Sequence, residues 1–259
     1  MLFDTHCHIH ESDYPLPVGD VLERARSAGV QHIVCVGTSE ESSRLAVEMA
    51  QTEQDVYATI GVHPHDTKDG YDTIRSIADT KPNNLIAIGE VGLDYFYDHS
   101  PRDVQIQALK EQIQIAVDHN LAIVFHVREA SSAQQRESAF QDFWTILDEF
   151  SGIRGVLHSF TDTQAHLDEA LRRGLYIGVN GISTFTKDDT QKAMFASIPL
   201  DRLVFETDAP YLTPDPFRGK VNEPAFVRNI AEHHAAIRGL TFDEVASATT
   251  ANARALFAL

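Results

Sequence analysis

The chain alternates between short apolar runs and polar or amphipathic segments of helical character. The apolar runs are rich in Val, Ile, Leu and Phe, a composition typical of buried strands. Continuous apolar strands separated by helices indicate a parallel sheet with a covered outer face, and eight such units favour closure into a barrel. We therefore predict an α/β fold, a (β/α)8 barrel of the TIM type, with an open doubly wound sheet as the alternative. The predicted strands cover residues 2–6, 32–37, 56–62, 85–90, 122–127, 154–160, 175–179 and 202–208.

Residues 100–120 show how a helix is predicted between two of these strands. Ser100 offers an N-cap with Asp103 three residues later, and Pro101 takes the first helical position. Apolar residues then recur at helical spacing, at Ile106, Leu109, Ile113 and Ala116.

The length of 259 residues fits one barrel, because this fold uses about 250 residues as one domain. No Pro-, Gly- or Ser-rich linker divides the sequence, so we expect a single domain over residues 1–259. The first ten residues carry charges and histidines where a signal peptide needs an apolar run, and no segment approaches the roughly 20 apolar residues of a membrane span. These features predict a cytoplasmic protein with no membrane partner. The two cysteines, Cys7 and Cys35, lie in strand-like runs and are expected to be buried thiols.

The formal net charge is −17, from 21 Lys and Arg against 38 Asp and Glu. Such a charge repels polyanions at long range and provides no global steering toward nucleic acid. A nucleic-acid substrate would therefore need local positive charge, supplied by bound metal ions and a few basic side chains.

Histidines and carboxylates stand at the C-terminal ends of the predicted strands, where barrel active sites are built. Because strand side chains alternate between faces, His6 and His8 are expected to point together while Cys7 points away, and the same parity joins the last two carboxylates. Nitrogen and carboxylate ligands without thiolates suit Zn²⁺, Mn²⁺ or similar ions, and Glu90 is placed to bridge two of them. The strand-end residues are His6, His8, His63, His65, Glu90, His126, His158, Glu206 and Asp208.

Other residues have simpler interpretations. His65 is interpreted as a packing residue more readily than as a residue with a direct role. Glu206 has an alternative interpretation as a structural carboxylate paired with an arginine. The glycines of GEVGLD and NGIST are expected to form tight turns. The polar stretch EASSAQQRES over 129–138 is expected to be an extended solvated loop, with a border to the substrate as the alternative. The histidines interpreted as surface or packing residues are His10, His32, His99, His119, His166, His233 and His234.

Several motifs together resemble the TatD family of metal-dependent deoxyribonucleases, within the amidohydrolase-type barrels. The motifs are DTHCH, GVHPH, AIGEVGLDYFYDHSPRDVQ, HVREA, LHSF and ETDAPYLTPDPFRGKVNEP, in consistent order from residue 4 to about residue 230. The resemblance implies a TIM-type barrel, divalent metal ions and hydrolysis of DNA phosphodiesters, commonly as a 3′-to-5′ exonuclease. Glu90 stands where phosphotriesterase-like barrels use a carboxylated lysine, and no lysine lies between Lys81 and Lys110. The 129–138 loop and Asn180 depart from the family pattern, which leaves substrate preference open.

Carried over to this sequence, the resemblance implies a set of metal ligands and a second set near the reacting phosphate. Its metal ligands are His6, His8, Glu90, His126, His158 and Asp208. His63 and Glu206 match positions near the phosphate, with a further ion as one option. The predicted cofactors are thus two divalent ions, Zn²⁺, Mg²⁺ or Mn²⁺, about 3.5–4 Å apart, with a third ion as that option.

The predicted mechanism uses a metal-bound hydroxide as the nucleophile. Asp208 would accept its proton and return one to the leaving oxygen, while Glu206 would position water or hold a third ion. The predicted partner is DNA, in particular single-stranded ends. Candidate phosphate contacts are Arg128, Lys187 and Arg218. Candidates for stacking on bases are Tyr95, Phe96, Tyr97, Tyr211 and Phe217, with loop packing as the alternative for each.

Two other functions stay open at this point. One is hydrolysis of a small-molecule amide, lactone or phosphoester at the same binuclear site, which the acidic composition modestly favours. The other is a non-catalytic metal- or ligand-binding protein on the same barrel, which the full set of ligand-type residues disfavours.

Overall fold

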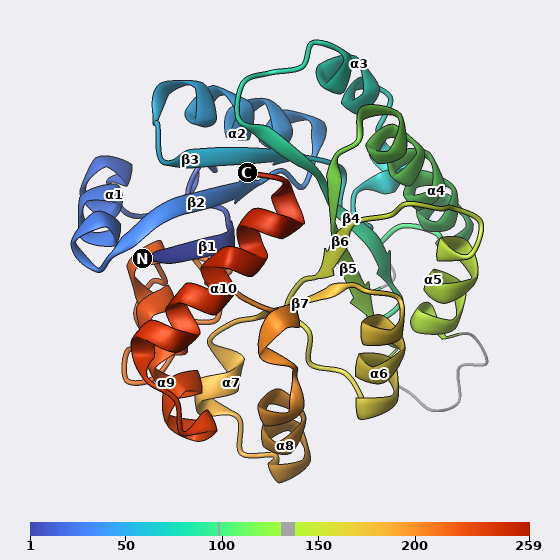
Figure 1. The fold of residues 1–259 in the computed structure, drawn as a ribbon. Coiled ribbons are helices and arrows are strands. Elements are labelled where there is room, and N and C mark those ends of the chain that lie inside the picture. The colour runs from blue at the N-terminus through green and yellow to red at the C-terminus, as the bar shows by residue number, and fades with distance from the viewer. Residues whose placement is uncertain (98, 131–137) are drawn as a thin grey trace.

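The computed structural model describes residues 1–97, 99–130 and 138–259, and an eight-stranded parallel sheet lies at its centre (Figure 1). Each strand pairs with the next one along the chain, in the order β1 to β8. An open doubly wound sheet would need an order that reverses at a switch point, so the predicted (β/α)8 barrel is confirmed. The strands are β1 (Leu2–Cys7), β2 (Val30–Val36), β3 (Val56–Ile60), β4 (Leu85–Asp94), β5 (Ala122–Arg128), β6 (Gly155–Leu157), β7 (Tyr176–Val179) and β8 (Leu203–Phe205).

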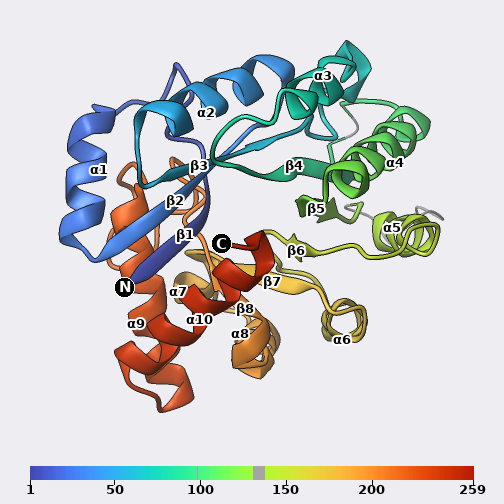
Figure 2. The same ribbon diagram turned by 45° about the horizontal axis from the view of Figure 1, so that its top comes forward.

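Helices surround the strands on the outside (Figure 2). In α4 the predicted apolar face is buried at Leu109, Ile113 and Ala116. None of the described helices combines the length and the apolar character that crossing a membrane requires. The α-helices are α1 (Val18–Ser27), α2 (Glu40–Thr52), α3 (Thr73–Asp79), α4 (Arg102–His119), α5 (Ala139–Leu147), α6 (Gln164–Arg172), α7 (Ile182–Phe185), α8 (Asp189–Ser197), α9 (Val227–Arg238) and α10 (Phe242–Phe257), and the 3-10 helices are η1 (Thr67–Asp69), η2 (Leu200–Arg202) and η3 (Pro224–Phe226).

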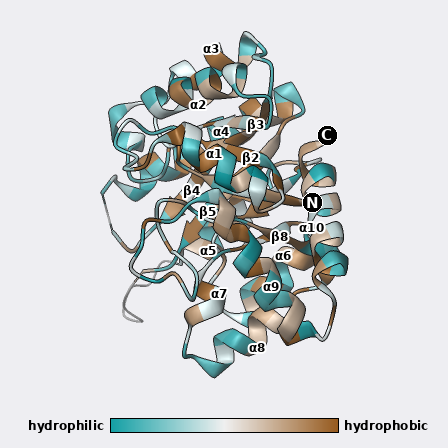
Figure 3. Ribbon diagram, turned by 90° about the vertical axis from the view of Figure 1, so that its left-hand side faces the viewer, coloured by the Kyte–Doolittle hydropathy of each residue, from teal (hydrophilic) through white to brown (hydrophobic). Residues whose placement is uncertain are grey.

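The C-terminal helix α10 covers the end of the barrel where the strands begin. A capping box between Thr241 and Glu244 starts this helix. Its residue Asn252 donates to the carbonyl of Leu203 at the start of β8, at 2.8 Å. Apolar strand residues pack against the last turns of α10, and the strands form the apolar centre of the molecule while polar residues lie on the outer helices (Figure 3). This apolar cluster includes Val34, Val124, Val156, Val204, Leu256 and Phe257.

β8 meets β1 through an isolated bridge and hydrogen bonds rather than a continuous ladder. The Asp208 N–H donates to the carbonyl of His6 at 2.9 Å. The buried Asp4 carboxylate accepts from the Thr207 N–H at 2.8 Å and from its hydroxyl at 2.6 Å. These contacts close the barrel and join the first strand to the turn that follows the last strand, beside His6 and Asp208.

Several predicted strand and helix boundaries differ from the structure by a few residues, and three of the differences concern the site. β4 continues to Asp94 instead of ending at Glu90, because residues 91–94 pair with β5. β8 ends at Phe205, so Glu206 and Asp208 follow the strand, and Asp208 has a left-handed backbone with φ 58°. Strand parity therefore does not relate these two carboxylates. Helix α4 has Pro101 as its N-cap, because the Ser100 hydroxyl donates to the carbonyl of His65 instead.

The second glycine of GEVGLD, Gly92, does not form the predicted tight turn. Gly92 lies inside β4, and a Cβ there would collide with the carbonyl oxygen of His126 on β5. The absent side chain thus allows the two strands to approach. The prediction of buried thiols is confirmed, since Cys7 and Cys35 are both free and buried. Most of the predicted 129–138 loop lies outside the described residues.

Candidate metal centre

A cavity of 690 Å³ opens at the C-terminal ends of the strands. Seven of the strand-end residues singled out in the sequence line it: His8, His63, His65, Glu90, His126, His158 and Asp208. His6 lies directly beneath them and is fully buried. Because each strand contributes from a different part of the chain, the barrel brings together side chains as distant in sequence as His6 and Asp208.

Four side chains form a first group around one point. His6 Nε2 lies 3.1 Å from His8 Nε2 and 3.3 Å from Glu90 Oε2. Asp208 Oδ1 lies 3.4 Å from His8 Nε2 and 3.7 Å from His6 Nε2. His6 and His8 therefore point together, as the alternation of strand side chains predicts.

A second group surrounds the other oxygen of the same glutamate. Glu90 Oε1 lies 2.7 Å from His126 Nδ1, 3.3 Å from His158 Nε2 and 3.5 Å from His63 Nε2. The two oxygens of Glu90 thus face two different sets of side chains. A carboxylate in this arrangement is suited to bridge two cations.

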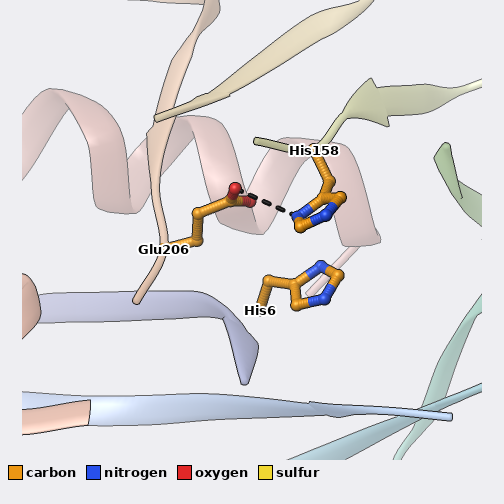
Figure 4. Close-up of side chains that lie close together, drawn as sticks. All are labelled: His6, His158 and Glu206. Atoms are coloured by element: carbon orange, nitrogen blue, oxygen red, sulfur yellow. Dashed lines mark hydrogen bonds and ion pairs between the residues drawn. The ribbon is translucent and has the colours of Figure 1, made fainter. Parts of the chain in front are cut away.

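The hydrogen bonds behind two of these rings determine which nitrogen faces the centre. His8 Nδ1 lies 3.0 Å from the carbonyl of Val36, which only accepts, so Nδ1 carries the proton and Nε2 presents a lone pair. His158 Nδ1 lies 3.1 Å from Glu206 Oε1 (Figure 4), so the neutral ring keeps its proton on Nδ1 and Nε2 is the nitrogen that faces Glu90. Glu206 is buried behind His158 and does not line the cavity that the described residues form.

Asp94 is a site residue that the sequence reasoning missed. One of its oxygens, Oδ2, lies 3.0 Å from His126 Nε2 and 2.9 Å from His65 Nε2. The other, Oδ1, accepts the backbone N–H groups of Phe96 and Tyr97 at 2.9 and 3.1 Å. A carboxylate that holds the outer nitrogen of a ligating histidine is a recurrent feature of metal sites. The predicted strand ended at Glu90, so sequence parity could not be extended to Asp94.

His63 has the opposite tautomer to His8 and His158. Its Nδ1 accepts the backbone N–H of His65 at 3.2 Å, so the neutral ring carries its proton on Nε2. The pKa of His63 is lowered well below its ordinary value by burial and by the nearby His126. His63 therefore presents an N–H donor to the cavity, rather than a lone pair.

The two carboxylates of the centre, Glu90 and Asp208, are held in the charged form. Burial opposes the charge of Glu90, but the neighbouring His158 and His63 lower its pKa well below the ordinary value. Burial also opposes the charge of Asp208, and His8 lowers its pKa. His158 shows the complementary effect: burial disfavours its positive charge, but Glu90 and Glu206 raise its pKa well above the ordinary value. The centre thus concentrates the negative charge of Glu90 and Asp208, and a positively charged group bound beside them would stabilise it.

The whole chain is similar to known proteins. A family model described as TatD related DNase matches residues 3–258. This chain belongs to the TatD family.

Relatives of the TatD-family protein match it over nearly its whole length. The uncharacterized metal-dependent hydrolase YabD of Bacillus subtilis is 38% identical over 263 residues, covering 99% of both chains. The 3′-5′ ssDNA/RNA exonuclease TatD of Citrobacter rodentium is 35% identical over 265 residues, covering 100% of this chain and 98% of its own. The crystal structure of YjjV from Escherichia coli, a TatD homologue, superposes with a TM-score of 0.86 at 28% identity, covering 100% of this chain and 98% of its own.

The donor set of this TatD-family protein fits divalent metal ions. In the first group, His8 Nε2 and both carboxylates bring no hydrogen, and the pKa of His6 is lowered by burial and by His158. At most one proton is then available among four facing acceptor atoms, an arrangement that a cation relieves. His6 Nδ1 is also buried without a hydrogen-bond partner among the described residues. Imidazole and carboxylate donors without a thiolate suit ions such as Zn²⁺ and Mn²⁺.

The structure separates the predicted substrate contacts. Tyr95 is only 2% exposed and its hydroxyl donates to Asp142 of α5 at 2.7 Å, so it is a packing residue and the stacking prediction for it is wrong. Phe217 stacks on Phe226 at 4.5 Å. Lys187 and Arg218 do not line the cavity of the described residues, whereas Arg128, Tyr97 and Tyr211 do.

Proposed function

We propose that this TatD-family protein is a 3′-to-5′ exonuclease that hydrolyses phosphodiester bonds in single-stranded DNA with two divalent metal ions. The observation that carries this proposal is the arrangement of Glu90, whose two oxygens face two separate groups of ligand-type atoms. Family membership supports the reaction class, and the name of the Citrobacter rodentium relative supports the polarity and the single-stranded substrate.

Glu90 would serve both proposed ions, one through each of its oxygens. His6, His8, Glu90 and Asp208 would hold the first ion. Glu90, His126 and His158 would hold the second. Bound there, the ions would supply Lewis acidity, activating a water molecule and neutralising charge on the phosphate.

The chain itself supplies the proton transfers. Asp208 lines the cavity as a charged carboxylate, so it is suited to accept the proton of the attacking water and to pass one to the leaving oxygen. His63 carries its proton on Nε2 and stays neutral, so we assign it the donation of a hydrogen bond to a phosphate oxygen. This tautomer argues against His63 as a ligand of a third ion. Glu206 acts through His158, by holding the proton on its Nδ1.

Incubation of the purified protein with single-stranded DNA labelled at the 5′ end tests the proposal. We expect a ladder of products that shorten from the 3′ end. EDTA should abolish the reaction and Mg²⁺, Mn²⁺ or Zn²⁺ should restore it, because without the ions nothing activates the water and the substrate phosphate faces the carboxylates of Glu90 and Asp208.

Three results would contradict the proposal. The first is full turnover by protein shown to be free of metal. The second is shortening from the 5′ end. The third is hydrolysis of small amide, lactone or phosphoester substrates together with complete inactivity on DNA, which would favour the small-molecule alternative.

A further inference from the structure

Exposed aromatic side chains stand at two separate places on the mouth of the cavity. Tyr97 follows β4, and Tyr211 follows β8. Strands β4 and β8 lie on opposite sides of an eight-stranded barrel in which each strand neighbours the next. The proposed metal ligands, and Glu90 in particular, therefore lie between the two rings.

Tyr211 is both exposed and held in place. Its side chain is 61% exposed, the highest value among the large apolar and aromatic residues that the structure describes as exposed. Its backbone is fixed next to the proposed metal ligand Asp208. The Tyr211 N–H donates to the carbonyl of Asp208 at 2.8 Å, and the Tyr211 carbonyl accepts from Asn222. An aromatic ring that is fixed at its base and open to solvent is suited to stack on a planar ligand.

The opposite wall combines a ring with a cation. The Tyr97 ring is 48% exposed, and the Arg128 guanidinium lies 4.8 Å from its centre and 4.1 Å from that of Phe96. The backbone of Tyr97 is tied to Asp94, which also holds His126. Among the described residues, Arg128 is the one lysine or arginine that lines the cavity.

A phosphodiester has one nucleoside on each side of the phosphorus, which matches two stacking walls with a phosphate-binding centre between them. We propose that Tyr211 stacks on the base on one side of the scissile phosphate and that Tyr97 with Arg128 stacks on the base on the other side. This inference rests on the proposed function and adds to it the side chains that recognise the two bases.

The two walls have a physical advantage in a chain with a net charge of −17. Stacking needs no surface charge, and every base has an aromatic face, so it tolerates any sequence. A base that stacks on either wall has left its partner and its neighbours, so the two walls select unpaired nucleotides over duplex. Stacking of two bases at the site would then provide binding energy that the acidic surface does not provide by long-range attraction.

The test is a set of single-stranded oligonucleotides with an abasic residue on one or the other side of the scissile phosphate. The wild-type protein, loaded with Mn²⁺, should lose about 5- to 150-fold in kcat/KM for each missing base. Tyr211→Ala should lose a similar factor on the intact strand and become indifferent to one abasic position. Tyr97→Ala should become indifferent to the other position.

Two controls separate stacking from structural damage. Tyr211→Phe keeps the ring and should behave as the wild type. Ile237→Ala removes an apolar side chain of α9 that is 43% exposed and does not line the cavity, and it should leave all rates unchanged. Metal content and melting temperature should be the same in every variant.

The inference is overturned if the wild type cleaves abasic and intact strands equally well, or if both tyrosine variants keep the full abasic penalty. Those results would leave hydrolysis of DNA, and hence the proposed function, intact. Failure of the wild type to cleave any of the oligonucleotides would instead remove the proposed function and this inference with it.

Discussion

Replacing Asp94 by asparagine should move the proton of His126 from Nε2 to Nδ1 without removing any proposed metal ligand. The backbone N–H groups of Phe96 and Tyr97 only donate, so the single oxygen of the introduced amide must stay where they need an acceptor. The amide nitrogen then occupies the place of Oδ2, 3.0 Å from His126 Nε2. It donates to that nitrogen, and the neutral imidazole must carry its proton on Nδ1. Nδ1 is the atom that lies 2.7 Å from Glu90 and faces the proposed second ion.

The expected loss follows from the role of such outer partners. Mutations of groups that orient a ligating histidine cost about 10- to 100-fold in metal affinity, or about 1.4–2.7 kcal/mol. Asp94→Asn belongs at the upper end of this range, because it places a proton on the ligating nitrogen instead of only loosening the ring. The affinity for the first ion should fall much less, since the Asp94 side chain contacts His65 and His126 and none of the proposed ligands of that ion.

Glu206→Gln provides a matched control, because it also removes one charge behind a histidine of the centre. The Glu206 oxygen that contacts His158 is the same Oε1 that accepts the Ser159 N–H. The oxygen of a glutamine can therefore keep both contacts, and His158 keeps its tautomer.

Titration of each variant with Zn²⁺ or Mn²⁺ in a calorimeter measures the two affinities, and ¹⁵N spectra of the imidazole groups report the tautomers. We expect a large loss at one site in Asp94→Asn and a small loss in Glu206→Gln. Equal affinities in the two variants, or an unchanged His126 tautomer in Asp94→Asn, would refute the reasoning.

Three further predictions concern metal content and stability. Glu90→Ala should lose both ions, because it removes an oxygen from each group, whereas Glu206→Gln should keep most of the metal and turn over slowly; equal metal content by mass spectrometry in both would contradict this. Gly92→Ala should lower the free energy of unfolding in urea by at least about 1–3 kcal/mol, since its Cβ would collide with the carbonyl of His126, and an unchanged urea midpoint would show that β4 and β5 can separate freely. Burial and the nearby Arg238 lower the pKa of His234 from 6.5 to about 3. His234 is therefore protonated in the unfolded chain but stays neutral in the folded chain as the pH falls. This difference should lower the free energy of unfolding by about 2 kcal/mol between pH 7 and pH 5. In His234→Gln, measured with EDTA present in both proteins, that part of the pH dependence should vanish.

The features that sequence reasoning predicted well are those with a short-range signature. Apolar runs and helical periodicity predict the order of strands and helices, and the strand ends bring His6, Glu90 and Asp208 together because all parallel strands end on one face of the barrel. The alternation of side chains also predicts correctly that His6 and His8 point together.

The features that it missed depend on contacts between distant segments. The extension of β4 to Asp94 depends on pairing with β5, which Gly92 permits by close approach, and neither register nor approach is visible in one segment. The tautomer of His8 depends on a carbonyl of β2, and the orienting role of Glu206 depends on the turn after β8. Local sequence patterns identify ligand-type residues, whereas the protonation of each ring is a property of the assembled barrel.

The junction of β1 with the turn after β8 has a consequence for how the protein is made on the ribosome. His6 and His8 leave the exit tunnel early, but their carboxylate partner Asp208 follows about 200 residues later. At roughly 5–20 residues per second, they wait on the order of ten seconds or more for it. During that interval the nascent chain cannot hold the first ion in its final place, so loading with metal is a late event and a truncated polypeptide would be released without a working centre.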